Sequence, residues 1–95
     1  MPEIRFQIQW PDGAQEDCYS PSLVVKQYFE PGAEYELDDF VERARTSLTI
    51  ASDRVQKKYG MPCSLALGQL RRIETTAASY RQLPTPKVSL LQFLE

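Results

Sequence analysis

Residues 3–13, EIRFQIQWPDG, set the architecture of this chain of 95 residues. Apolar and polar side chains alternate without a fault as far as Trp10, which is typical of a strand with one buried face. Pro11 has its backbone angle already set for the first corner of a turn, and Asp12 suits the second. Gly13 tolerates the left-handed backbone that closes a three-residue hairpin. The sequence therefore predicts a β-hairpin at the N-terminus.

This hairpin also predicts the register of the second strand. Ile8 lies opposite Glu16 and Phe6 opposite Cys18 when the turn has three residues. Cys18 then points toward the core. Glu16 shares that apolar face, so its carboxylate must reach the rim of the sheet or find a base.

The segment after the second strand turns sharply at Pro21, because proline lacks an N–H and restricts the residue before it. We expect Ser20 to cap a short helix that has Pro21 in its first position and carries Leu23, Val24 and Tyr28 or Phe29 inward. Residues 33–37 are short and acidic, and they predict at most an edge strand.

Two amphipathic helices follow and are predicted to form an antiparallel hairpin, because only a few residues separate them. The first opens at Asp38 or Asp39, and Asp39 has capping-box spacing to Glu42. It ends at Gly60, and the second helix runs over residues 64–80. The apolar stripes are Phe40, Ala44, Leu48, Ala51, Val55 and Tyr59 in the first helix and Ala66, Leu70, Ile73, Ala77 and Tyr80 in the second.

A last strand is predicted over residues 87–94, and it is apolar on both faces. These faces are Val88, Leu90 and Leu94 on one side and Leu91 and Phe93 on the other. A strand buried on one side would not need a second apolar face. We therefore expect that face to meet a partner subunit or the short helix, and we expect a homodimer.

The fold class predicted from these elements is α+β, in a single domain over residues 1–95. The N-terminal hairpin and the last strand would form a small antiparallel sheet, and the helix hairpin would cover one of its faces. No apolar run is long enough to span a membrane, and the N-terminus lacks the pattern of a signal peptide. We therefore expect a cytoplasmic protein that binds no membrane.

The composition argues against several classes of function. The chain contains no histidine, which removes the commonest general base and the commonest metal ligand. We predict no catalytic residue, no metal and no cofactor.

Ten of the 13 acids lie in residues 1–42, whereas nine of the 11 bases lie in residues 43–95. Nucleic-acid binding is not favoured, because the net charge is -2 and the first helix is too long for a helix-turn-helix motif.

Two cysteines are the candidates for chemistry. Cys63 begins the second helix, where unpaired N–H groups favour a thiolate. Cys18 ends the second strand, and the two sulfurs could meet if the helix packs over that strand end. They could then act as a redox pair or as half of a metal site, or both cysteines could be inert packing residues.

Short segments in a fixed order carry a family resemblance: MPEIRF at residues 1–6, WPDG at 10–13, CYSPSL at 18–23, RAR at 43–45, ASDRV at 51–55 and YGMPCS at 59–64. They resemble a small bacterial family of nitrogen starvation response proteins. Members of that family are typically encoded beside a nitrilase, a radical S-adenosylmethionine protein, an acetyltransferase, a flavin-dependent oxidoreductase and a protein like aminoimidazole ribotide synthetase. The resemblance implies a role in scavenging nitrogen from nitriles or cyanide during starvation. It marks Cys18, Tyr19, Ser20 and Cys63 as candidate functional positions.

Two hypotheses about function follow from the composition, the cysteines and the resemblance. The first is a non-enzymatic accessory protein that binds partner proteins of the same nitrogen-scavenging pathway. The alternative is a small thiol-dependent enzyme or carrier that uses Cys18 or Cys63. The lack of histidine favours the first hypothesis, and thiol reactivity would distinguish the two.

Overall fold

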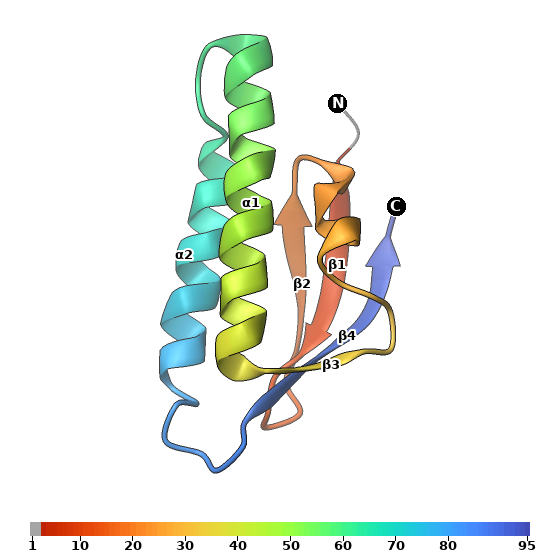
Figure 1. Ribbon diagram of the computed structural model, residues 1–95, viewed down its shortest axis with the longest axis vertical. Coiled ribbons are helices and arrows are strands. Elements are labelled where there is room, and N and C mark those ends of the chain that lie inside the picture. The colour runs from red at the N-terminus through yellow and green to blue at the C-terminus, as the bar shows by residue number, and fades with distance from the viewer. Residues whose placement is uncertain (1–2) are drawn as a thin grey trace.

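The computed structural model describes residues 3–95 and shows a four-stranded antiparallel sheet with two helices on one face (Figure 1). The spatial order of the strands is β2-β1-β4-β3. This arrangement confirms the predicted α+β class. The elements in chain order are β1 (Ile4–Gln9), β2 (Gln15–Ser20), the short 3₁₀ helix η1 (Leu23–Gln27), β3 (Glu34–Glu36), α1 (Leu37–Tyr59), α2 (Ser64–Ala78) and β4 (Lys87–Leu94).

The N-terminal hairpin has the predicted turn and register. The backbone N–H of Trp10 donates to the carbonyl of Ala14 at 2.8 Å, and Gly13 adopts a left-handed φ of 91°. Phe6 lies opposite Cys18, as expected from a three-residue turn.

Glu16 lies on the apolar face opposite Ile8 and finds its base there, as predicted. Arg72 of α2 donates from Nε to the Glu16 carboxylate at 2.6 Å, and Trp10 donates its indole N–H to the same group at 3.1 Å. This acid therefore joins the hairpin to α2.

The core forms between the sheet and the helices, as the apolar stripes predict. Trp10 is stacked on the ring of Tyr80 and meets Phe40 edge-on. Phe29, which follows η1, closes the core beside Phe6 and Phe40. The fully buried side chains include Ile4, Phe6, Ile8, Cys18, Phe40, Leu48, Ile73, Val88 and Leu90.

The short helix differs from the prediction at its cap. Ser22 is the N-cap, and its Oγ accepts a hydrogen bond from the backbone N–H of Val24 at 3.3 Å. Ser20 cannot serve, because it still belongs to β2 and its buried hydroxyl donates to the Ser22 carbonyl at 2.7 Å. Leu23 is exposed rather than turned inward, whereas Val24 and Phe29 are buried as predicted.

The start of α1 also differs from the prediction. The helix begins at Leu37, directly after β3, and its N-cap Glu36 makes no side-chain cap hydrogen bond. The N–H of Leu37 donates instead to the carbonyl of Pro86 at 3.0 Å. A carbonyl distant in sequence thus satisfies the helix start, and Asp39 is free to pair with Arg43.

A β-bulge changes the faces of β4. The pairing with β1 shifts by one residue, which leaves Leu91 as an extra residue in the strand. Phe93 consequently lies opposite Phe6 and packs against the core, with the Lys26 ammonium of η1 5.8 Å from its ring centroid. The prediction that Leu91 and Phe93 share an outer face is therefore wrong. The homodimer stays a prediction that no longer rests on Phe93.

The C-terminus of α1 provides a test of local backbone energetics. Gly60 has a left-handed φ of 83°, and its N–H donates to the carbonyl of Gln56 at 2.7 Å. A Cβ at this position would meet no atom within 4 Å, so substitution affects only the backbone. We expect Gly60→Ala to lower the free energy of unfolding by about 1 kcal/mol in urea titrations. Gly60→Asn should cost less, and equal stability of the alanine variant and the wild type would contradict this assignment.

Candidate functional site

Two of the four candidate positions lie inside the protein. Cys18 is fully buried in the core, and burial is the main factor that raises the pKa of its thiol, followed by the charges of Glu16 and Asp17. Ser20 is also buried, and its hydroxyl bonds only to the backbone of Ser22. In this structure both side chains hold the end of β2 in place.

The other two candidates, Tyr19 and Cys63, lie near each other at the surface. Burial raises the pKa of the Tyr19 hydroxyl most, and the nearby Cys63 thiol and Glu3 carboxylate raise it further. The guanidinium carbon of Arg5 lies 5.8 Å from the Tyr19 ring centroid. Cys63 is the N-cap of α2 and makes no side-chain cap bond. The structure thus brings Cys63 close to Tyr19, and both cysteines are free thiols.

A groove of about 420 Å³ opens beside Tyr19, between the start of α2 and the first two strands. The Gln69 side chain lines it and accepts a hydrogen bond from the backbone N–H of Tyr19 at 3.0 Å. Gln69 thereby covers part of the free edge of β2. Its buried Nε2 has no acceptor among residues 3–95. The residues around the groove are Glu3, Arg5, Tyr19, Ser64, Leu65, Gly68, Gln69 and Arg72.

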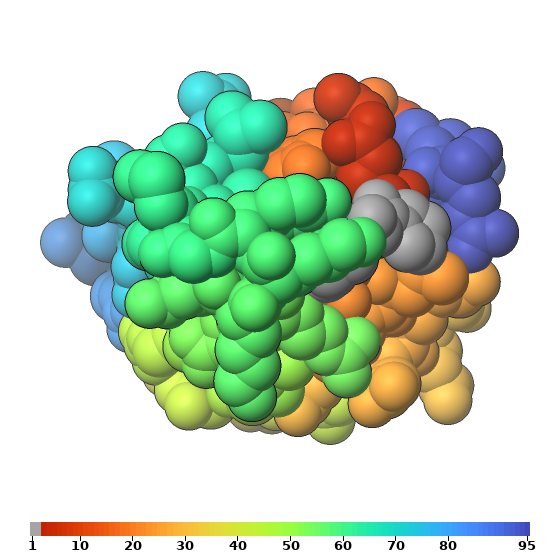
Figure 2. Space-filling model, turned by 90° about the horizontal axis from the view of Figure 1, so that it is seen from above, coloured from red at the N-terminus to blue at the C-terminus, as the bar shows by residue number. Residues whose placement is uncertain are grey.

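The helix hairpin extends beyond the sheet at the end where α1 and α2 join (Figure 1). Its length explains the overhang, because the 23 residues of α1 span about 35 Å whereas the six residues of β1 span about 20 Å. Figure 2 looks directly onto this end. Tyr59, Met61 and Leu65 are 63%, 72% and 66% exposed there. We call these three residues the apolar tip, and the prediction that Tyr59 faces the core is wrong.

The charges are separated along α1. Lys57 and Lys58 occupy its last turn beside the apolar tip, and within the described residues 3–95 neither pairs with a carboxylate. Arg54 lies one turn earlier and donates to the hydroxyl of Ser22 at 3.0 Å. The opposite end carries the exposed acids Glu34, Glu36, Asp38, Asp39 and Glu42, of which Glu34, Asp38, Asp39 and Glu42 form ion pairs with Lys87, Arg81, Arg43 and Arg45. This distribution matches the helix dipole and makes the tip end of the molecule basic.

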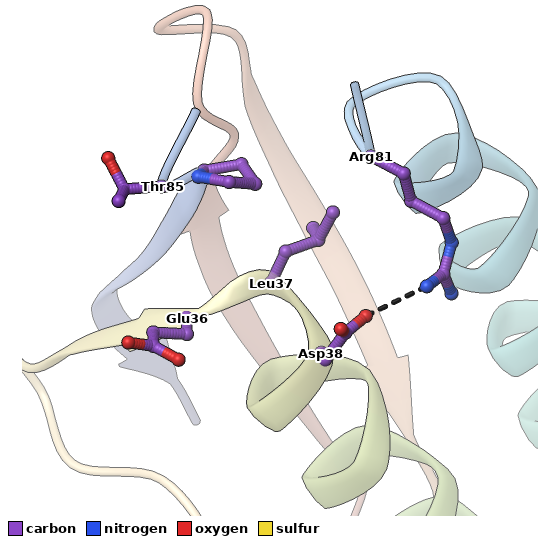
Figure 3. Close-up of a pocket in the computed structure, with 6 residues that line it drawn as sticks. Glu36, Leu37, Asp38, Arg81 and Thr85 are labelled. Atoms are coloured by element: carbon purple, nitrogen blue, oxygen red, sulfur yellow. Dashed lines mark hydrogen bonds and ion pairs between the residues drawn. The ribbon is translucent and has the colours of Figure 1, made fainter. Parts of the chain in front are cut away.

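A smaller hollow of about 340 Å³ lies at the acidic end (Figure 3). Asp38 of α1 accepts a hydrogen bond from Arg81 at 2.8 Å, so these two charges neutralise each other. Glu36 and Thr85 point away from this pair in Figure 3. The ion pair in this hollow connects the segment after α2 to the start of α1. Among the residues that line the hollow, no acid and base point to a common position where they could act on a substrate.

The part of the chain that the structure describes contains no group of three or more histidine, cysteine, aspartate or glutamate side chains placed to hold a metal ion. None of the helices described is long and apolar enough to cross a membrane.

In a comparison with protein families, residues 5–93 match the family of nitrogen starvation-induced protein NitG. The chain belongs to the NitG family. The match spans most of β1, most of β4 and every element between them, so it extends beyond the motifs that end at residue 64. No curated protein and no solved structure matches the chain.

Sequence reasoning missed the most exposed surface of this NitG family member. It placed Tyr59 in the core and assigned no role to Met61 or Leu65. It gave Gly68 a turn or packing role, but Gly68 lies inside α2 and a Cβ there would meet no atom within 4 Å. One signal was available, because the predicted first helix is much longer than the predicted strands. A helix that extends beyond the sheet it covers must expose the final part of its apolar stripe.

Proposed function

We propose that this chain is a non-enzymatic accessory protein that binds a partner protein in a nitrogen-starvation pathway, one that scavenges nitrogen from nitriles or cyanide. Membership of the NitG family supports the link to nitrogen starvation. The lack of histidine and the burial of Cys18 support a binding role over catalysis.

The apolar tip is the observation that carries this proposal. Three large apolar side chains, Tyr59, Met61 and Leu65, are each more than half exposed at one end of the molecule. Tyrosine and methionine are enriched in protein interfaces, and clustered exposed apolar residues mark interaction sites. The tip projects past the sheet, so a partner can reach it without meeting the strands (Figure 1).

The thiol-dependent alternative rests on Cys63, which is partly exposed at the start of α2 and close to Tyr19. A carrier or enzyme of this kind would use Cys63, because the Cys18 side chain is fully buried in the core. The Cys63→Ser variant distinguishes the two functions. If the chain is a binding protein, this variant still binds its partner; if the chain is a thiol-dependent enzyme or carrier, this variant loses its activity.

A tip variant tests the proposed function. Replacing Tyr59, Met61 and Leu65 by serine should abolish recovery of the partner when the tagged chain is isolated from nitrogen-limited cells of its own organism. Stability should change by no more than about 0.5 kcal/mol, since these side chains are exposed. The control variant replaces the exposed residues Leu23 and Leu83 by serine and should retain the partner. Equal recovery by the tip variant and the wild type would exclude the tip as the binding surface.

A further inference from the structure

We propose that the groove over Gly68, together with the adjoining apolar tip, binds an acidic segment of the partner protein that inserts an apolar side chain above Gly68. This inference rests on the proposed function and specifies the surface and the chemistry of the partner. Leu65 connects the two parts, since it belongs to the tip and also lines the groove.

Gly68 lies inside α2, where glycine is among the least favoured residues. Its backbone does not have the positive φ that would require glycine. A Cβ at this position would meet no atom within 4 Å, so no packing contact in the described chain requires its absence either. The missing side chain leaves a notch at the surface of α2, and this open space can admit a side chain of an approaching partner.

The notch opens into the groove because of helical spacing. Leu65, Gly68 and Arg72 are three and four residues apart and therefore share one face of α2. Tyr19 lines the groove from β2 and contributes its ring. An apolar side chain that enters above Gly68 would contact Leu65 on the helix and Tyr19 on the sheet.

The charges around this surface favour an acidic partner. Lys57 and Lys58 have no carboxylate partner within residues 3–95, and they border the tip. At the groove itself Arg5 and Glu3 balance and Arg72 is already paired with Glu16, so the excess of base at this surface comes from Lys57 and Lys58. The excess of base attracts carboxylates, which would surround the inserted apolar side chain.

The shape of the surface favours a protein over a lipid bilayer. Exposed lysines beside apolar residues also suit an anionic membrane. A bilayer is a broad surface, however, and its headgroups need no recess such as the groove of about 420 Å³ that Gly68 lines. A protein segment fills such a notch with a single residue, as interface anchors do in the pockets of their partners.

The experiment first identifies the segment that enters the groove. A photoreactive phenylalanine derivative replaces Leu65 in the full chain, which is irradiated in nitrogen-limited cells, and the attached peptide is sequenced. That peptide is then synthesised, and its affinity is measured for the wild type, Gly68→Met and Thr75→Met. Thr75 is exposed on α2 in the same way, so its variant adds a methionine outside the groove and serves as the matched control.

We expect the peptide to be acidic and to contain an apolar residue. Its affinity for Gly68→Met should be lower than its affinity for the wild type by a factor of about ten or more, whereas its affinity for Thr75→Met should equal that for the wild type. Gly68→Met should unfold at a urea concentration equal to or higher than that of the wild type, so lost binding cannot result from misfolding. A basic or uncharged peptide, normal binding by Gly68→Met, or attachment to lipid together with binding to phosphatidylserine vesicles would overturn this inference. If the partner is recovered and the tip is needed while Gly68→Met binds normally, the proposed function survives and this inference fails. If no partner is recovered, both fail.

Discussion

Iodoacetamide should alkylate Cys63 of the native protein at least about a hundredfold faster than Cys18. Cys63 is partly exposed at the first turn of α2, where it can be reached without unfolding. Cys18 is fully buried, and its raised thiol pKa keeps it protonated in the folded state. Its alkylation must therefore wait for the structure to open. Mass spectrometry of digested samples taken over time measures both rates.

Two controls make the labelling result specific. Cys63→Ser should remove the fast reaction and leave the slow one, and both cysteines of the wild type should react at similar rates in concentrated urea. Rapid labelling of Cys18 in the native protein would mean that the end of β2 opens far more readily than its packing indicates. If Cys63→Ser abolished the cellular response to nitrogen starvation without changing the fold, the thiol-dependent alternative would replace the proposed function.

The largest loss of stability is expected at Phe40, where substitution by alanine should lower the free energy of unfolding by about 3–5 kcal/mol. Phe40 is fully buried and contacts the rings of Trp10 and Phe29, so truncation leaves a cavity between α1 and the sheet. Equilibrium unfolding in urea measures the change. Partner binding at temperatures where the variant remains folded should be unaffected.

Tyr59→Ala is the matched control for Phe40→Ala, because it removes an aromatic ring of similar size from the same helix. Tyr59 is mostly exposed, so its removal should change stability by no more than about 0.5 kcal/mol while weakening partner binding. Similar losses of stability in the two variants would show that the tip is packed in solution. The pair of variants thus separates the roles of the two ends of α1.

The N-terminal hairpin shows how much local sequence can predict. The alternation up to Trp10 and the turn at Gly13 were sufficient to predict that Cys18 is buried and that Glu16 must reach the rim of the sheet or find a base, and the structure shows the base. Gly60 likewise predicted the end of α1. These features depend on the backbone preferences of a few consecutive residues and on which face of a strand is apolar. Both properties can be read without knowing what packs against them.

The features that sequence reasoning missed all depend on contacts between distant segments. The first N–H of α1 is satisfied by the carbonyl of Pro86, which no local cap signal could reveal. The bulge at Leu91 arises from the fit of β4 against β1, and it moves Phe93 to the core face. The apolar tip and the groove over Gly68 exist because α1 and α2 are longer than the strands they cover. An apolar stripe shows which face of a helix can be buried, but the extent of the opposing sheet sets how far along the helix that burial continues.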